Sequence, residues 1–151
     1  MEKFSKEIIS DSSIKTMELG EYFGLNLPNG STVLLTGDLG AGKTTFVRGL
    51  AKSLNISDVV QSPTFNIMKV YMKGDRPLIH IDAYRLADFN VDIGLDEYIG
   101  YESGITVIEW PMFIEDLLPE NCVEINITHA GENTRNISIT TSDKNLLGGI
   151  K

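Results

Sequence analysis

The fold of this chain is decided by the stretch Gly37-Asp38-Leu39-Gly40-Ala41-Gly42-Lys43-Thr44. It follows the apolar run Val33-Leu34-Leu35 and opens onto residues 45–52, which have a helix-like sequence. The pattern G-x-x-x-x-G-K-[ST] between a strand and a helix predicts a loop that cradles phosphate. Its glycines let successive backbone amides point at phosphate oxygens, and the helix adds the positive end of its dipole. The sequence therefore predicts binding of a nucleoside triphosphate, with Lys43 on the phosphates and the Thr44 hydroxyl on magnesium.

Composition and charge limit the class of protein. The chain has 151 residues, 42% hydrophobic and 23% charged, which fits one globular domain over residues 1–151. A single cysteine, Cys122, leaves no internal disulfide, and no apolar run has the length of a membrane span or a leader core. We therefore expect a cytoplasmic protein without membrane contact. The net charge of −8 opposes direct binding to nucleic acid, so any RNA or DNA would be reached through a protein partner.

The first part of the chain predicts a helix. Asp11-Ser12-Ser13 has the composition of an N-cap, and the Pro-Asn-Gly turn at residues 28–30 would follow the end of the helix. Helical spacing puts Ile14, Met17 and Tyr22 on its apolar side.

Further periodicity predicts an α/β fold. Strands are expected at residues 31–36, 66–71, 77–82, 104–110, 122–128 and 135–140, and helices at 44–54, 95–99 and 111–118. The strands 66–71 and 77–82 should form an antiparallel hairpin. We expect parallel strands around the phosphate loop, antiparallel strands added to them, and a loose tail over residues 142–151.

Two acids follow apolar strands and are candidates to bind the metal of a magnesium nucleotide. Asp82 ends the run Leu78-Ile79-His80-Ile81, and Glu109 ends the run Ile105-Thr106-Val107-Ile108. Nucleotides bind at the carboxyl ends of parallel strands, where such carboxylates can approach the cation. Sequence position alone does not say which acid holds the metal.

Three other residues have two interpretations each. Thr64 lies where a loop can order around a γ-phosphate, but a hydroxyl that satisfies the turn at Pro63 is slightly favoured. His80 alternates with isoleucines, so a hydrogen-bonded core imidazole is favoured over a catalytic base. Trp110 could pack in the core, but its place after Glu109 favours an aromatic wall at the nucleotide site.

Missing motifs narrow the nucleotide and the reaction. The chain has no [NT]-K-x-D segment that reads guanine and no D-x-x-G, so ATP is favoured over GTP. It also has no arginine-rich lid, which disfavours a small-molecule kinase. A kinase and a nucleotide-gated binding module remain the alternatives to an ATPase.

Four segments, in this order, resemble one family. They are the phosphate loop with Thr45, Ser62-Pro63-Thr64-Phe65, the run from His80 to Leu86, and Glu109-Trp110-Pro111. Together they resemble the TsaE family, the small bacterial ATPases needed to make N6-threonylcarbamoyladenosine in tRNA. The resemblance covers about residues 10–140 and is loose between Asp88 and Ser103. It implies a P-loop NTPase-like three-layer α/β fold with a mixed, partly parallel sheet flanked by helices.

The resemblance also implies partners and roles. The partners would be TsaD and TsaB homologues, with TsaD transferring the threonylcarbamoyl group, so tRNA would be met only through the complex. Thr44 and Glu109 would ligate Mg²⁺, which resolves the choice between the two acids by resemblance alone. Lys43, Asp82, Glu109 and Thr64 would be catalytic. The implied nucleotide-binding residues are Ser13, Thr16, Asp38, Leu39, Gly40, Ala41, Gly42, Lys43, Thr44, Thr45, Trp110 and Arg135.

Overall fold

The computed structural model describes residues 2–38, 40–63, 67–87 and 94–150, with the backbone alone at Arg85 and Ala87. Within these residues the strands are β1 (Phe4–Ser10), β2 (Ser31–Gly37), β3 (Met68–Tyr71), β4 (Leu78–Asp82), β5 (Ile105–Glu109), β6 (Val123–His129) and β7 (Arg135–Thr141). The α-helices are α1 (Ser13–Asn26), α2 (Lys43–Ser53) and α3 (Lys144–Gly148), and the 3-10 helices are η1 (Tyr84–Ala87), η2 (Leu95–Glu97) and η3 (Pro111–Leu117). No helix in these ranges is long and apolar enough to cross a membrane.

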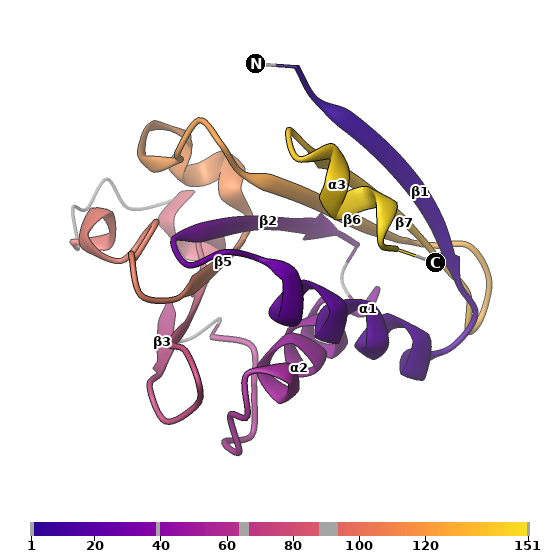
Figure 1. Cartoon of the computed structure of the whole chain (residues 1–151), viewed down its shortest axis with the longest axis horizontal. Coiled ribbons are helices and arrows are strands. Elements are labelled where there is room, and N and C mark those ends of the chain that lie inside the picture. Colours follow the sequence, from indigo (N-terminus) through magenta and orange to yellow (C-terminus); the bar gives the residue numbers. More distant parts are fainter. Residues whose placement is uncertain (1, 39, 64–66, 88–93, 151) are drawn as a thin grey trace.

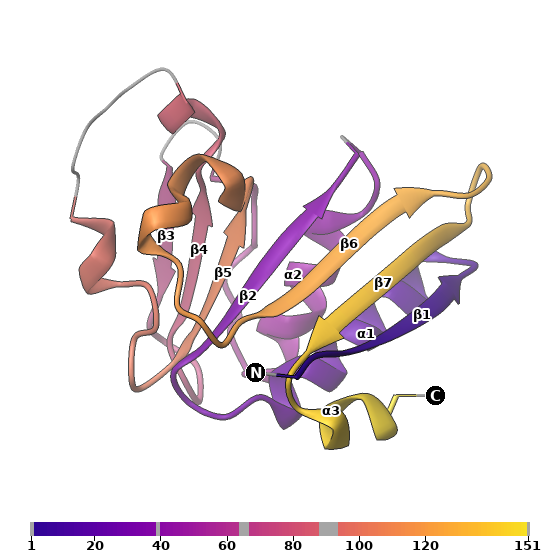
Figure 2. The same cartoon turned by 90° about the horizontal axis from the view of Figure 1, so that it is seen from above.

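The strands form one mixed sheet in the order β1-β7-β6-β2-β5-β4-β3 (Figures 1 and 2). β2 is parallel to β5 and β6, β4 is parallel to β5, and β1, β3 and β7 are antiparallel to their neighbours. Every residue of β4 and β5 is buried, whereas β6 alternates between buried and exposed residues over most of its length. This difference is typical of strands covered on both faces and on one face, respectively. The predicted mixed sheet and the predicted hairpin are confirmed.

Helices α1 and α2 cover one face of the sheet (Figure 2). They approach closely because glycines stand at their contact: a Cβ on Gly20 would lie 2.1 Å from the Phe46 carbonyl oxygen, and one on Gly49 would lie 2.0 Å from that of Met17. The rings of Phe23 and Phe46, one from each helix, are 5.7 Å apart between centroids at the centre of this core.

The 3-10 helices cover the opposite face of β2, β4 and β5. Leu86 of η1, Leu95 of η2 and Ile114 of η3 belong to a second apolar cluster. The sheet contributes alternate residues to it, namely Leu34, Ile79, Ile81 and Ile108. The sheet therefore lies between a layer of α-helices and a layer of short 3-10 helices, and the predicted three-layer α/β fold is confirmed.

The predicted apolar side of the first helix was wrong. Ser12 is the N-cap, as expected, and its side chain accepts a hydrogen bond from the Lys15 amide. However, Ile14 is 69% exposed, and the buried face consists of Thr16, Leu19, Gly20, Phe23 and Gly24. Gly20 and Gly24 belong to this face because their close contact with α2 leaves no room for a Cβ, which apolar periodicity does not register.

The two ends of the chain also differ from expectation. The expectation of a loose tail was wrong, because α3 lies within residues 142–151 and buries Leu146 and Leu147. Asp143 caps this helix by accepting hydrogen bonds from two backbone amides. At the other end, residues 4–10 form β1, for which the sequence predicted no element, and pair with β7 along its whole length.

Candidate functional site

The phosphate loop runs from the end of β2 to the start of α2, and its glycines shape it. Gly37, Gly40 and Gly42 have φ angles of 141°, 75° and 108°, which residues other than glycine rarely adopt. A Cβ on Gly37 would lie 1.9 Å from the Ile127 carbonyl oxygen on β6, so only glycine fits there. Gly42 is the N-cap of α2, so the positive end of the helix dipole adjoins the loop.

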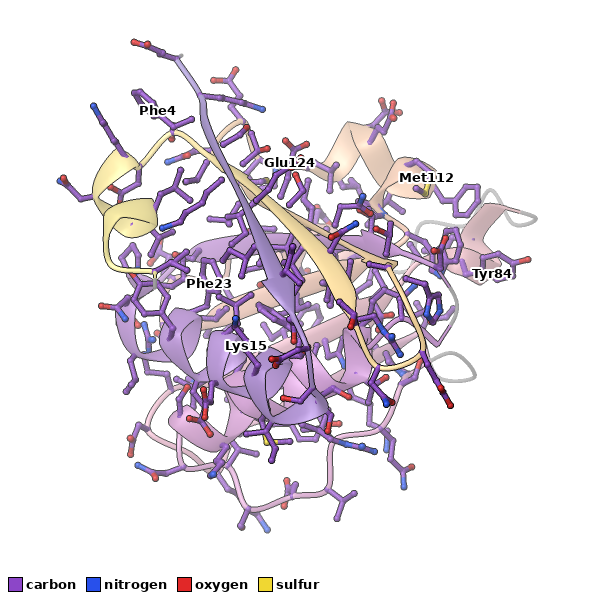
Figure 3. The ribbon with its side chains drawn as sticks, turned by 90° about the vertical axis from the view of Figure 1, so that its right-hand side faces the viewer. Phe4, Lys15, Phe23, Tyr84, Met112 and Glu124 are labelled. Carbon is purple, nitrogen blue, oxygen red and sulfur yellow. The ribbon has the colours of Figure 1, made fainter. Side chains whose placement is uncertain are left out.

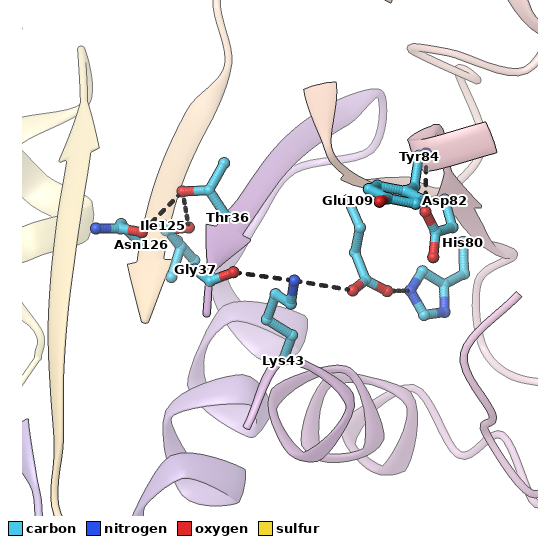
Figure 4. A network of polar contacts seen from close by, with 9 residues as sticks. All are labelled: Thr36, Gly37, Lys43, His80, Asp82, Tyr84, Glu109, Ile125 and Asn126. Atoms are coloured by element: carbon cyan, nitrogen blue, oxygen red, sulfur yellow. Dashed lines mark hydrogen bonds and ion pairs between the residues drawn. The ribbon is translucent and has the colours of Figure 1, made fainter. Parts of the chain in front are cut away.

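Lys43 is buried and makes polar contacts on both sides (Figure 4). Its Nζ donates a hydrogen bond to the Gly37 carbonyl oxygen at 3.2 Å and lies 3.8 Å from Oε1 of Glu109. The same Nζ is 4.7 Å from the ring centroid of Trp110, within the range of cation–π attraction. These contacts offset part of the cost of burying an ammonium group.

The two candidate acids lie side by side at the carboxyl ends of β4 and β5. Asp82 and Glu109 are register partners, and each is 3% exposed. Oε2 of Glu109 is 2.7 Å from Nε2 of His80, and Oδ1 of Asp82 accepts a hydrogen bond from the Tyr84 amide at 3.0 Å. His80 is fully buried and hydrogen-bonded, as its favoured interpretation requires. Because Lys43 approaches Oε1 of the same glutamate, Glu109 links the phosphate loop to β4.

Trp110 leaves β5 in a strained conformation and belongs to an aromatic cluster. Its φ and ψ of 56° and 51° lie in the left-handed region, which is uncommon for a bulky side chain. Its ring centroid is 5.1 Å from that of Tyr84 and 6.4 Å from that of Phe113. Tyr84 is 53% exposed and Phe113 37% exposed. We call these three residues the aromatic ledge.

A cavity of about 690 Å³ joins the phosphate loop to the two acids. It is lined by Gly40, Gly42, Lys43, Thr44, Thr45, Ser62, Asp82, Tyr84, Glu109 and Trp110. The structure thus brings most of the predicted residues together, and Trp110 lines the cavity with them; its role as a wall for a nucleotide stays a prediction. Ser62 and Tyr84 were not predicted, although each lies two residues from a predicted one. Thr64 and Leu39 lie outside the described residues.

A second space of about 370 Å³, here called the side hollow, lies on the other side of the loop. It is lined by Asp11, Ser12, Ser13, Gly40, Gly42, Thr45, Asn133 and Arg135. Nε of Arg135 donates a hydrogen bond to the Ala41 carbonyl oxygen at 3.0 Å, which ties the start of β7 to the loop. Ser13 and Arg135 therefore line the same space, together with Ser12 and Asn133, which the sequence did not single out as binding residues.

Two other predicted residues are placed differently. The Thr16 side chain is 2% exposed, and its Oγ1 is 2.7 Å from the Ser10 Oγ. An ideal Cβ at Gly42 would be 3.8 Å from the Thr16 methyl, so Thr16 supports the loop from behind and does not line the side hollow. Asp38 is exposed and lines neither space, and its backbone carbonyl accepts a hydrogen bond from the Ala41 amide.

Fold and site together define the class: this is a P-loop NTPase-like α/β protein. The model of the family described as "Threonylcarbamoyl adenosine biosynthesis protein TsaE" matches residues 10–137, and the chain belongs to the TsaE family. A relative from Bacillus subtilis, named tRNA threonylcarbamoyladenosine biosynthesis protein TsaE, is 47% identical over 111 residues, covering 74% of this chain and 70% of the relative. A relative of the same name from Treponema pallidum is 41% identical over 133 residues, covering 87% and 97%.

A solved structure is similar over almost the whole chain. The crystal structure of Bacillus subtilis YdiB superposes with a TM-score of 0.81 and 31% sequence identity. The match covers 98% of this chain and 93% of that one, so the shared fold includes β1 and the C-terminal segment.

Proposed function

We propose that this protein is a magnesium-dependent ATPase that supports the synthesis of N6-threonylcarbamoyladenosine in tRNA. The observation that carries the proposal is the buried contact of Lys43 with Glu109 beside a phosphate loop, in a chain of the TsaE family. A purely structural ion pair would gain little from this placement, because buried pairs seldom add to stability.

The loop residues fit a nucleotide. Among the described residues and apart from chain neighbours, no atom lies within 4 Å of an ideal Cβ at Gly40, and only the Thr16 methyl does so at Gly42. A phosphate can therefore approach the backbone there. The amino end of α2 and the Lys43 ammonium provide positive potential on the same side. The ammonium has three donors, and Lys43 can therefore turn from Glu109 to phosphate oxygens.

The acids beside the loop fit a magnesium ion. Mg²⁺ is usually held by one or two carboxylates together with substrate phosphates. Thr44 and Glu109, which both line the cavity, would hold it, and the ion would neutralise charge that develops on the phosphates. Asp82 stands next to Glu109 and would orient the attacking water, with Thr64 assisting.

The side hollow is the proposed place for the nucleoside. It shares Gly40, Gly42 and Thr45 with the larger cavity, so one molecule can extend from one space to the other past the loop. Ser13 and Arg135 would face the ribose or base there.

The proposed partners are TsaD and TsaB homologues, met in the cytoplasm, with tRNA reached through them. Tyr84 and Trp110 of the aromatic ledge line the cavity, so a partner protein docked on the ledge would lie beside it. Met112, 46% exposed, lies at the same end of the molecule as Tyr84 (Figure 3). The net charge of −8 is consistent with indirect contact with tRNA.

The test is ATP turnover with Mg²⁺, measured alone and with purified TsaD and TsaB. We expect slow hydrolysis that the partners accelerate and that Lys43→Ala abolishes. Lys52→Ala is the matched control, because Lys52 lies on the same helix with a side chain 71% exposed. A rate that neither the partners nor Lys43→Ala change would overturn the proposal. Stoichiometric phosphoryl transfer to a metabolite would instead indicate a kinase. Modification that persists in a variant that binds ATP without hydrolysing it would indicate a binding module.

A further inference from the structure

His80 is a fully buried histidine whose described polar contact is with Glu109 (Figure 4). It stands in the middle of β4 between Ile79 and Ile81. Its Nδ1 has no hydrogen-bond partner among the described residues. Burying an imidazole with one nitrogen unpaired costs free energy that an aliphatic side chain would not cost. We therefore look for the role of His80 in the contact that its other nitrogen, Nε2, makes with Glu109.

That contact fixes the orientation of a carboxylate. Nε2 of His80 is 2.7 Å from Oε2 of Glu109. Because a carboxylate oxygen only accepts hydrogen bonds, we assign the N–H to Nε2 of His80. The other oxygen, Oε1, is left facing Lys43 and the phosphate loop. A glutamate side chain without such a bond would have several rotamers to choose from, and ordering them costs entropy.

The topology explains why this imidazole reaches this acid. β4 and β5 are parallel, with Asp82 opposite Glu109 and His80 two residues earlier on the same face of β4. The histidine thus approaches Glu109 from the side away from the loop and leaves the loop side open.

We propose that His80 is a positioning residue that orients Glu109 toward a divalent cation at the phosphate loop. The inference rests on the proposed function, because it assigns Glu109 to the cation. Removing such a partner of a metal ligand typically weakens metal binding by about 10–100-fold. His80 itself touches neither nucleotide nor cation, so metal-free nucleotide binding should not depend on it.

The test compares two amides that differ in reach. His80→Gln places an N–H near the position of Nε2, whereas His80→Asn places it near Nδ1, away from Glu109. ADP binding in EDTA is followed by the fluorescence of Trp110, the single tryptophan of the chain. Mn²⁺ binding to the ADP complex is then measured by electron paramagnetic resonance, which does not depend on activity.

We expect His80→Asn to weaken Mn²⁺ binding at least tenfold and His80→Gln to stay within about threefold of the wild type. ADP affinity in EDTA should stay within about twofold in both. Thr106→Val is the matched control, because it removes a partly buried hydrogen bond of β5, to the Tyr98 carbonyl oxygen, from a residue that does not line the cavity, and it should leave Mn²⁺ binding unchanged. If the asparagine variant does not fold, His80→Leu, which has no N–H to donate to Glu109, takes its place.

Equal Mn²⁺ affinities for the Asn and Gln variants would overturn the positioning role. The positioning role would also be overturned if His80→Asn lost as much affinity for ADP in EDTA as it lost for Mn²⁺. Both results leave the proposed function standing. A wild-type protein that binds neither ADP nor Mn²⁺ would overturn the proposed function itself.

Discussion

Two regions of this molecule bury ionisable side chains and offset the cost in different ways. At the carboxyl ends of β4 and β5, Glu109 is buried together with Lys43 and His80, and each of these two contacts it. Before the amino end of β6, the thiol of Cys122 is buried and donates a hydrogen bond to the Pro119 carbonyl oxygen at 3.0 Å. The pKa of this thiol is raised to about 11, chiefly by burial and also by the Glu124 carboxylate, while the Lys3 ammonium acts in the opposite direction.

This difference between the two regions indicates which of them has a chemical function. A thiol held neutral by burial costs little and needs no further explanation. Buried charged groups that pair with one another are seldom a gain in stability, so their presence beside a cavity favours a chemical role. The predictions below test whether the two regions differ in this way.

The largest effect is expected from Glu109→Gln, which removes the charge that Lys43 faces and the proposed cation ligand. We expect ATP hydrolysis to fall about 100-fold or more, because one electrostatic partner of a reacting group is typically worth 100–1000-fold. ATP binding in EDTA should persist, since the amide keeps the size of the side chain. Phosphate release measures the hydrolysis, and a titration in EDTA measures the binding of ATP. Glu115→Gln, at an exposed position on η3, should have no effect, and a similar loss in both variants would contradict the comparison.

The residues at this edge could largely be predicted from the sequence. The phosphate loop has a fixed pattern with a defined strand and helix on either side, and Asp82 and Glu109 end apolar strands, so their positions follow from local order. The contact of His80 with Glu109 could not be predicted in this way. The two residues are 29 positions apart in the sequence, and they meet only because β4 and β5 are neighbouring strands in the sheet.

Elsewhere the sequence was a poorer guide, for physical reasons. The face of α1 is chosen by close packing at Gly20 and Gly24, which hydrophobic periodicity does not detect. The tail contains a helix of only five residues, stabilised by the Asp143 cap and by burial, and so short a helix has little pattern of its own. The left-handed backbone of Trp110 has no signal in residue types.

A smaller effect is expected from Arg135→Ala in the side hollow, where the contacts are partly exposed. The variant loses the hydrogen bond to the Ala41 carbonyl oxygen and the proposed contact with the nucleoside. We expect ATP affinity to fall about tenfold, the value of one charge-assisted hydrogen bond, with hydrolysis of bound ATP changed less than about threefold. Asn136→Ala, at the exposed next residue of β7, is the control. An unchanged affinity would place the nucleoside elsewhere.

The smallest effect concerns Cys122 and the stability of the fold in alkali. Because its pKa is raised from 9.0 to about 11, the folded state holds the proton more tightly than the unfolded state. Its contribution is therefore fully present below pH 9 and is lost as the pH rises through 11. Between pH 8 and pH 10 the free energy of unfolding should fall by about 1 kcal/mol more in the wild type than in Cys122→Ala. Denaturant titrations at the two pH values measure this difference.

Comparing the wild type with Cys122→Ala isolates the contribution of the thiol, since the other groups that titrate at alkaline pH, including Tyr22, are present in both proteins. The Tyr22 hydroxyl also has a raised pKa, through burial and the nearby Asp143, so both proteins should lose some stability at high pH. Parallel losses in the two would mean that the thiol ionises equally well in the folded and unfolded states. Burial at Cys122 would then not keep the group neutral, and the contrast with the paired charges around Glu109 would fail at this end of the sheet.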